Sequence, residues 1–154
     1  MKTTILLTLA LAAVPSLALA TPVGLEVEMG SYMGEEAFFV VYVIDSEGRY
    51  AKTLWVAGRD RAYYKEMARW WKYLARQPQD LDAITGASVG SDEGVTLAFE
   101  IDEAMLNAGY SLRIESAVEE LTVFAEDAVI PLSDASRGQT IEGSGYIDFV
   151  ILNY

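Results

Sequence analysis

The sequence contains no cysteine and no histidine. Without cysteine the chain forms no disulfide and has no thiol nucleophile, and without histidine it lacks the side chain that most often transfers protons near neutral pH. Ordinary zinc and iron–sulfur sites are excluded as well, because their protein ligands are mainly cysteine and histidine. A Ca²⁺ or Mg²⁺ site built from carboxylates remains open.

Basic residues are also scarce, since 11 Lys and Arg stand against 23 Asp and Glu, which gives a formal net charge of −12. Such a chain repels phosphate backbones, so nucleic acid is a poor partner, and an anionic membrane surface is disfavoured for the same reason. The apolar fraction of 52% in 154 residues is enough for the core of one ordinary domain.

The first 20 residues have the organisation of a secretory signal peptide. Lys2 precedes the apolar run 5–14 (ILLTLALAAV), and Ala18–Ala20 has the small-x-small form of a cleavage site. The run is shorter than the roughly 20 residues that span a bilayer, which favours a cleaved signal over an uncleaved anchor. No cysteine follows it, so no lipid anchor is expected. We expect residues 21–154 to form a mature periplasmic or secreted protein.

The mature segment carries repeated β-strand patterns separated by turn residues. The run 38–44 (FFVVYVI) is too short and too β-branched for a helix, and it is predicted to form a hairpin with 50–56. Further strands are predicted at 25–29, 95–101, 110–115, 121–125, 129–130 and 146–152. This spacing is typical of a mainly β protein, and we expect one antiparallel, immunoglobulin-like β-sandwich domain over 21–154.

One segment, 62–77 (AYYKEMARWWKYLARQ), predicts an α-helix inserted into the sandwich. It contains no Gly or Pro, and its large apolar residues recur on one helical face, at Met67, Trp70, Trp71 and Leu74. Asp60 is positioned as the N-cap, and Pro78 is expected to end the helix.

The loop that follows the helix contains the pattern D-x-x-[S/T]-G-A-[S/T], formed by Asp82, Thr85, Gly86, Ala87 and Ser88. The pattern resembles the acceptor sequence of the periplasmic flavin transferase, which moves an FMN group from FAD onto the last Ser or Thr. The resemblance implies FMN attached covalently to Ser88 through a phosphodiester, with the other four residues recognised by the transferase. Gly86 and Ala87 suit such an acceptor, because their small size lets the backbone enter a transferase cleft.

The likeness extends over most of the mature chain. In order along the sequence it rests on the helix with Trp70 and Trp71, the motif 82–88, the turn 107–110 with the strand 112–115, and the run 143–147. Together these segments resemble a family of small predicted periplasmic proteins of unknown function, whose genes often accompany flavin transferases and PepSY-type membrane reductases. The family commonly ends the motif in Thr, where this chain has Ser88. The resemblance implies an electron-transfer protein rather than a stand-alone enzyme, with these two proteins as partners.

Two alternatives stay open on the sequence alone. The aromatic residues of the helix could stack on the flavin ring and shield it, or they could simply pack as its core face; they are Tyr63, Tyr64, Trp70, Trp71 and Tyr73. The loop 82–88 could likewise be an ordinary turn in a non-redox binding or accessory module of the periplasm.

Other candidate sites are weaker. A hydrolase built on Ser88 has no histidine to activate the hydroxyl, and Lys72 is near only in sequence. The acidic pairs Asp92–Glu93 and Asp102–Glu103 lack the ligand spacing of an EF-hand loop, so no metal site is expected.

Overall fold

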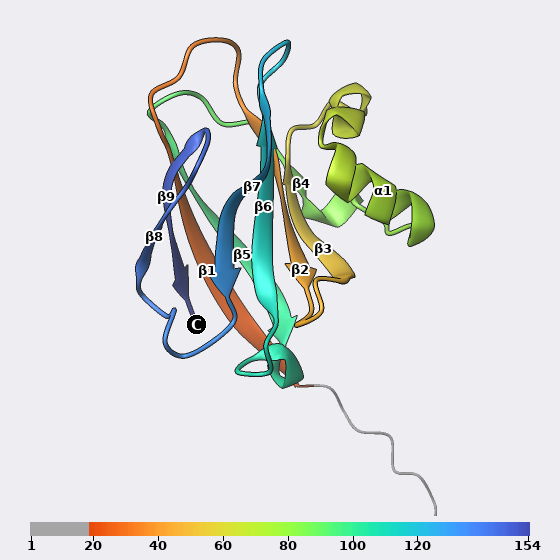
Figure 1. Cartoon of the computed structure of the whole chain (residues 1–154), viewed down its shortest axis with the longest axis vertical. Helices are drawn as coiled ribbons and strands as arrows, with labels where there is room; N and C mark the ends of the chain where they lie inside the picture. Colours follow the sequence, from red (N-terminus) through yellow and green to blue (C-terminus); the bar gives the residue numbers. More distant parts are fainter. Residues whose placement is uncertain (1–18) are drawn as a thin grey trace, which may run out of the picture.

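The computed structural model describes residues 19–154, and the predicted signal peptide lies outside these described residues except for its last two positions. The strands are β1 (Ala20–Met29), β2 (Phe38–Ile44), β3 (Tyr50–Ala57), β4 (Thr85–Gly86), β5 (Gly94–Asp102), β6 (Ser111–Ala117), β7 (Val123–Pro131), β8 (Thr140–Glu142) and β9 (Ile147–Asn153). They form two packed sheets, with the strand orders β5-β1-β9-β8 and β4-β3-β2-β6-β7 (Figure 1). The predicted mainly β sandwich is confirmed.

Most of the strand predictions hold, with three differences. The pairing of β2 with β3 confirms the predicted hairpin. The two predicted segments 121–125 and 129–130 are one continuous strand, β7. The strands β4 and β8 have only two and three residues, which is too few for an alternating sequence pattern to predict them. The short β4 also runs parallel to β3, whereas the other strand pairs of the two sheets are antiparallel.

Strand β2 is buried along its whole length, because layers cover it on both sides. Phe39, Val41 and Val43 belong to the core between the two sheets. Val40 and Tyr42 belong to a second core on the outer face, under the helical segment. Burial on both faces explains why this strand reads as a continuous apolar run rather than as an alternating one.

The outer face of this sheet is covered by a 3₁₀-helix, η1 (Arg61–Glu66), followed by the α-helix α1 (Ala68–Arg76) (Figure 1). The prediction of one helix over 62–77 is therefore wrong at Met67, whose φ of −74° and ψ of 67° separate the two helices. Asp60 acts as expected at the N-terminus, since its side chain accepts a hydrogen bond from the N–H of Ala62 at 2.9 Å.

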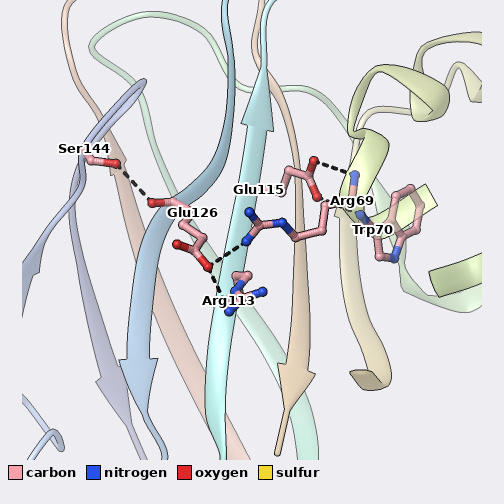
Figure 2. A network of polar contacts seen from close by, with 6 residues as sticks. All are labelled: Arg69, Trp70, Arg113, Glu115, Glu126 and Ser144. Atoms are coloured by element: carbon pink, nitrogen blue, oxygen red, sulfur yellow. Dashed lines mark hydrogen bonds and ion pairs between the residues drawn. The ribbon is translucent and has the colours of Figure 1, made fainter. Parts of the chain in front are cut away.

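A buried carboxylate on β6 gives the reason for the break. Glu115 accepts hydrogen bonds from the backbone N–H groups of Arg69, at 3.2 Å, and of Trp70, at 2.9 Å (Figure 2). These donors lie in the first turn of α1, where N–H groups have no partner within the helix and a negative charge is stabilising. The Glu115 side chain thus stabilises the start of α1, although it lies far from this helix in the sequence.

An ion-pair network continues from this point across the outer face (Figure 2). Arg69 and Arg113 both pair with the Glu126 carboxylate of β7, at 2.6 and 2.9 Å. The Ser144 hydroxyl donates to the Glu126 carbonyl at 3.0 Å. These contacts connect α1 to β6, β7 and the loop before β9.

The Glu115 carboxyl gives a pH-dependent stability. Burial raises its pKa, while the N–H groups of Trp70 and Arg69 oppose the shift. A raised pKa in the folded state contributes stability that is fully present in acid and is lost as the pH rises through the folded pKa. We therefore expect the free energy of unfolding of the wild type, relative to Glu115→Gln, to fall as the pH rises from the ordinary pKa of a glutamate through the raised pKa of Glu115. Urea unfolding of both proteins at several pH values checks this, and a pH-independent difference would contradict it.

Among residues 19–154, no helix combines the length and the apolar character needed to cross a bilayer.

Candidate functional site

The motif loop runs along the edge of the five-stranded sheet. Asp82 opens a short 3₁₀-helix, η2 (Asp82–Ile84), and Thr85 and Gly86 form β4 beside β3. The N–H of Gly58 donates to the Gly86 carbonyl at 3.0 Å. Val89 then exchanges two backbone hydrogen bonds with Ala37, at 2.8 and 2.9 Å. Backbone bonds therefore hold the chain on both sides of Ser88.

The two hydroxyls of the motif have different environments. Thr85 Oγ1 donates to the Leu81 carbonyl at 2.7 Å, which closes the turn that the motif begins. Ser88 is half-buried, and its Oγ donates to the exposed carboxylate of Glu36 at 2.5 Å. The Thr85 hydroxyl thus bonds within the loop, whereas the Ser88 hydroxyl bonds to an exposed side chain of another segment.

The remaining motif residues also have identifiable positions. The Asp82 carboxylate forms an exposed ion pair with Arg61 at 2.5 Å, which connects the motif to η1. Ala87 is exposed. Gly86 lies directly on the Trp55 ring, since a Cβ added to it would fall 2.5 Å from Cζ2 of that ring. No side chain larger than hydrogen fits between this backbone and Trp55.

Two clefts border Ser88. The larger has a volume of about 340 Å³, and Ser88 lines it together with Glu35, Glu36, Phe38, Gly58, Arg59, Asp60, Tyr63 and Glu119. The smaller has a volume of about 200 Å³ and lies on the Trp55 side, where Ser88 lines it with Ala57, Ala87, Val89, Glu93, Gly94 and Val95. The last hydroxyl of the motif therefore lies at the border between two concave surfaces, each with aromatic lining.

A model of the family described as "Predicted periplasmic protein (DUF2271)" matches residues 20–148. The chain belongs to this family. No curated protein and no solved structure matches it. The family's periplasmic description agrees with the exported location expected from the N-terminal sequence.

For this family member, the aromatic side chains of the helix largely belong to the core. Trp70 is fully buried, and its indole N–H donates to Thr53 Oγ1 at 2.8 Å. Of the two alternatives left open for Trp70, the structure therefore supports core packing, because this side chain is turned to the sheet. Trp71 is 41% exposed but lines neither cleft beside Ser88. Tyr64 is buried and Tyr73 is packed against the same core.

The aromatic residues that do line the clefts are Tyr63, Phe38 and Trp55. Of these three, the sequence indicated only Tyr63 as a possible neighbour of a flavin ring, because Phe38 and Trp55 have the pattern of ordinary strand residues. Their approach to Ser88 follows from the pairing of β4 with β3 and from the Ala37–Val89 bridge. Neither contact has a local sequence signal.

The acidic pairs considered for a cation serve as turn residues instead. Glu93 accepts the N–H of Gly90 at 3.0 Å, and Asp102 accepts the N–H of Ala104 at 3.0 Å. Within residues 19–154, no group of three or more acidic side chains gathers in the manner of a metal site.

The contact between Gly86 and Trp55 gives a testable prediction. We expect Gly86→Ala to lower the free energy of unfolding by about 1–3 kcal/mol, because the added methyl overlaps the ring. Gly24→Ala is the matched control, since a Cβ there would meet only the Asn153 carbonyl, at 3.9 Å. Thermal unfolding of both variants checks the prediction, and equal melting temperatures would contradict it.

Proposed function

We propose that this protein is an exported electron-transfer protein that carries FMN, attached through a phosphodiester to Ser88. The observation that carries the proposal is the position of the Ser88 hydroxyl, which ends the flavinylation-like motif and opens onto two aromatic-lined clefts. The periplasmic family supports it further, because flavin transferase acts in that compartment.

The attachment is a phosphoryl-type transfer with FAD as donor. Ser88 Oγ attacks the phosphorus of FAD that bears the ribityl chain, and a new P–O bond forms. The bond from this phosphorus to the bridging oxygen of the pyrophosphate breaks, so AMP leaves. The hydroxyl proton passes to a base of the transferase or to water, and no electrons are exchanged.

The residues around Ser88 fit such a group in part. Tyr63 offers aromatic surface to a planar ring beside Phe38, which is 6% exposed, and Arg59 offers a guanidinium that can pair with a phosphodiester. Bound flavin would supply the electron transfer, while the protein holds the cofactor and sets its surroundings. Covalent attachment suits an exported protein, because it prevents loss of the cofactor.

The proposed partners follow from the same function. A flavin transferase would load the chain, and a PepSY-type membrane reductase would exchange electrons with it. The net charge of −12 would favour a partner whose contact surface is basic.

Intact mass spectrometry tests the proposal on the mature protein, made in a periplasm with and without active flavin transferase. We expect a gain of one FMN group, less water, only when the transferase is present. Fragmentation should place the added mass on the segment 82–88. A known acceptor made in the same cells shows that the transferase is active, and an unchanged mass beside a loaded control would overturn the proposal.

A second candidate function is a non-redox binding or accessory module of the periplasm. The contact between Ser88 and Glu36 favours it, because a carboxylate 2.5 Å from the acceptor oxygen opposes an added phosphate. Under this alternative the motif only fixes the sheet edge through its backbone bonds to Gly58 and Ala37. An unchanged mass beside a loaded control is the result that this alternative expects.

A further inference from the structure

The larger cleft has an aromatic wall that is held in place. The rings of Phe38 and Tyr63 lie with their centroids 5.5 Å apart and their planes tilted by 33°. The Tyr63 hydroxyl donates to Glu119 at 3.0 Å, which fixes the outer end of the ring. At Gly58, whose φ is +125°, a Cβ would lie 2.9 Å from the Phe38 Cβ. Glycine at this position lets the backbone of residue 58 pack directly against Phe38.

The two clefts differ in how well they suit a planar ring. Small-molecule sites commonly have volumes of about 300–1,000 Å³, and the larger cleft reaches this range at about 340 Å³. The smaller cleft has only about 200 Å³. Its aromatic residue, Trp55, is moreover already in contact with the Gly86 backbone, which covers part of the ring.

From this comparison we infer that the isoalloxazine ring of a flavin on Ser88 lies in the larger cleft, against Tyr63 and Phe38. The inference rests on the proposed function and goes beyond it, because it assigns the cofactor's site and therefore its electrostatic surroundings.

These surroundings are strongly acidic. The carboxylates that line the larger cleft are Glu35, Glu36, Asp60 and Glu119, whereas Arg59 is the one basic residue in its lining. Arg59 is therefore the side chain available to pair with the phosphodiester. The carboxylates oppose the added negative charge of a reduced flavin, so the midpoint potential of the bound flavin should lie below that of free FMN.

Flavin fluorescence on the loaded protein tests the position of the ring. A tyrosine ring stacked on isoalloxazine quenches its emission by electron transfer, so Tyr63→Ser should raise the fluorescence severalfold. Tyr63→Trp keeps an oxidisable aromatic wall without the bond to Glu119 and should keep most of the quenching, whereas Tyr63→Phe, whose ring cannot supply the electron, should lose it. Trp71→Ser, which removes an exposed aromatic residue outside both clefts, and Trp55→Leu, which alters the smaller cleft, should leave the fluorescence unchanged.

The midpoint potential provides an independent readout. Glu35→Gln removes one carboxylate from the lining of the larger cleft and should shift the potential upward. Glu142→Gln makes the same change on β8, in the other sheet, and should leave the potential unchanged. Because both side chains are exposed, a folding defect is not expected to obscure the comparison.

The outcomes separate the two proposals. A loaded protein whose fluorescence responds to Trp55→Leu but not to Tyr63→Ser would place the ring in the smaller cleft and overturn the inference alone. If the fluorescence of the loaded protein changes in neither variant, the ring lies in solvent, and the inference is likewise overturned. A chain that gains no FMN mass would overturn the proposed function, and the site of the ring with it.

Discussion

Replacing Asp127 with alanine is expected to lower the free energy of unfolding by about 3–5 kcal/mol, which would be a large effect for one side chain. Asp127 is buried on β7, and its carboxylate accepts hydrogen bonds from four consecutive backbone N–H groups, at 2.7–3.1 Å, those of Ser144, Gly145, Tyr146 and Ile147. It also accepts a bond from the buried Ser116 hydroxyl. Alanine would leave these donors without their shared acceptor.

Urea unfolding of Asp127→Ala beside Asp148→Ala gives the comparison that isolates this effect. Asp148 is exposed on β9, so its loss should change stability little. Asp127→Asn is informative as well, because it retains the size of the side chain but turns one acceptor oxygen into a donor that faces N–H groups. If Asp127→Ala is no less stable than Asp148→Ala, the Asp127 carboxylate does not stabilise the segment 144–147 that leads into β9.

The predictable part of the fold is the part with local patterns. The run of β2 and the alternation of β5 and β6 each bury side chains in ways that the sequence displays, so these strands and the sandwich class follow from it. The helix boundary does not, because α1 starts where the Glu115 carboxylate meets its N-terminus. A carboxylate 45 residues farther along the chain than Trp70 leaves no periodic signal near Met67.

The candidate site was predictable only at its centre. The motif marks Ser88 because its residue types and spacing are local. The walls of the larger cleft come from four segments distant in sequence, 35–38, 58–63, residue 88 and residue 119, which meet only after the sheets form. The sequence therefore offered the conspicuous Trp70 and Trp71 only as possible flavin neighbours beside the alternative of core packing, and Trp70 belongs to the outer core of the same sheet.

The burial of Trp70 and the partial exposure of Tyr63 have a physical reason. A large aromatic residue at helical spacing gains most by complete burial, so Trp70 is removed from the surface where a cofactor could reach it. The residues left at the cleft are those whose strand or 3₁₀ geometry exposes one edge, as with Tyr63. Aromatic content in a sequence thus predicts the core more readily than it predicts a flavin site.

The largest functional effect is expected for Ser88→Ala, which should abolish the transferase-dependent gain of FMN mass. The attack needs a hydroxyl at this position, and alanine has none. The fold should be nearly unaffected, because Ser88 is half-buried and its one side-chain bond goes to the exposed Glu36. We expect a change in the free energy of unfolding of less than about 1 kcal/mol.

Two variants control this experiment, which is read by intact mass and by the yellow colour of the denatured protein. Ser88→Thr keeps a hydroxyl and should retain the FMN mass, since the motif accepts either residue. Ser91→Ala removes a hydroxyl from the same loop and should also retain it. FMN that stays attached to Ser88→Ala after denaturation would assign the flavin to another residue. Equal loss in Ser91→Ala would instead trace the effect to the shape of the loop, because the Ser91 hydroxyl accepts the N–H of Tyr32 at 3.0 Å.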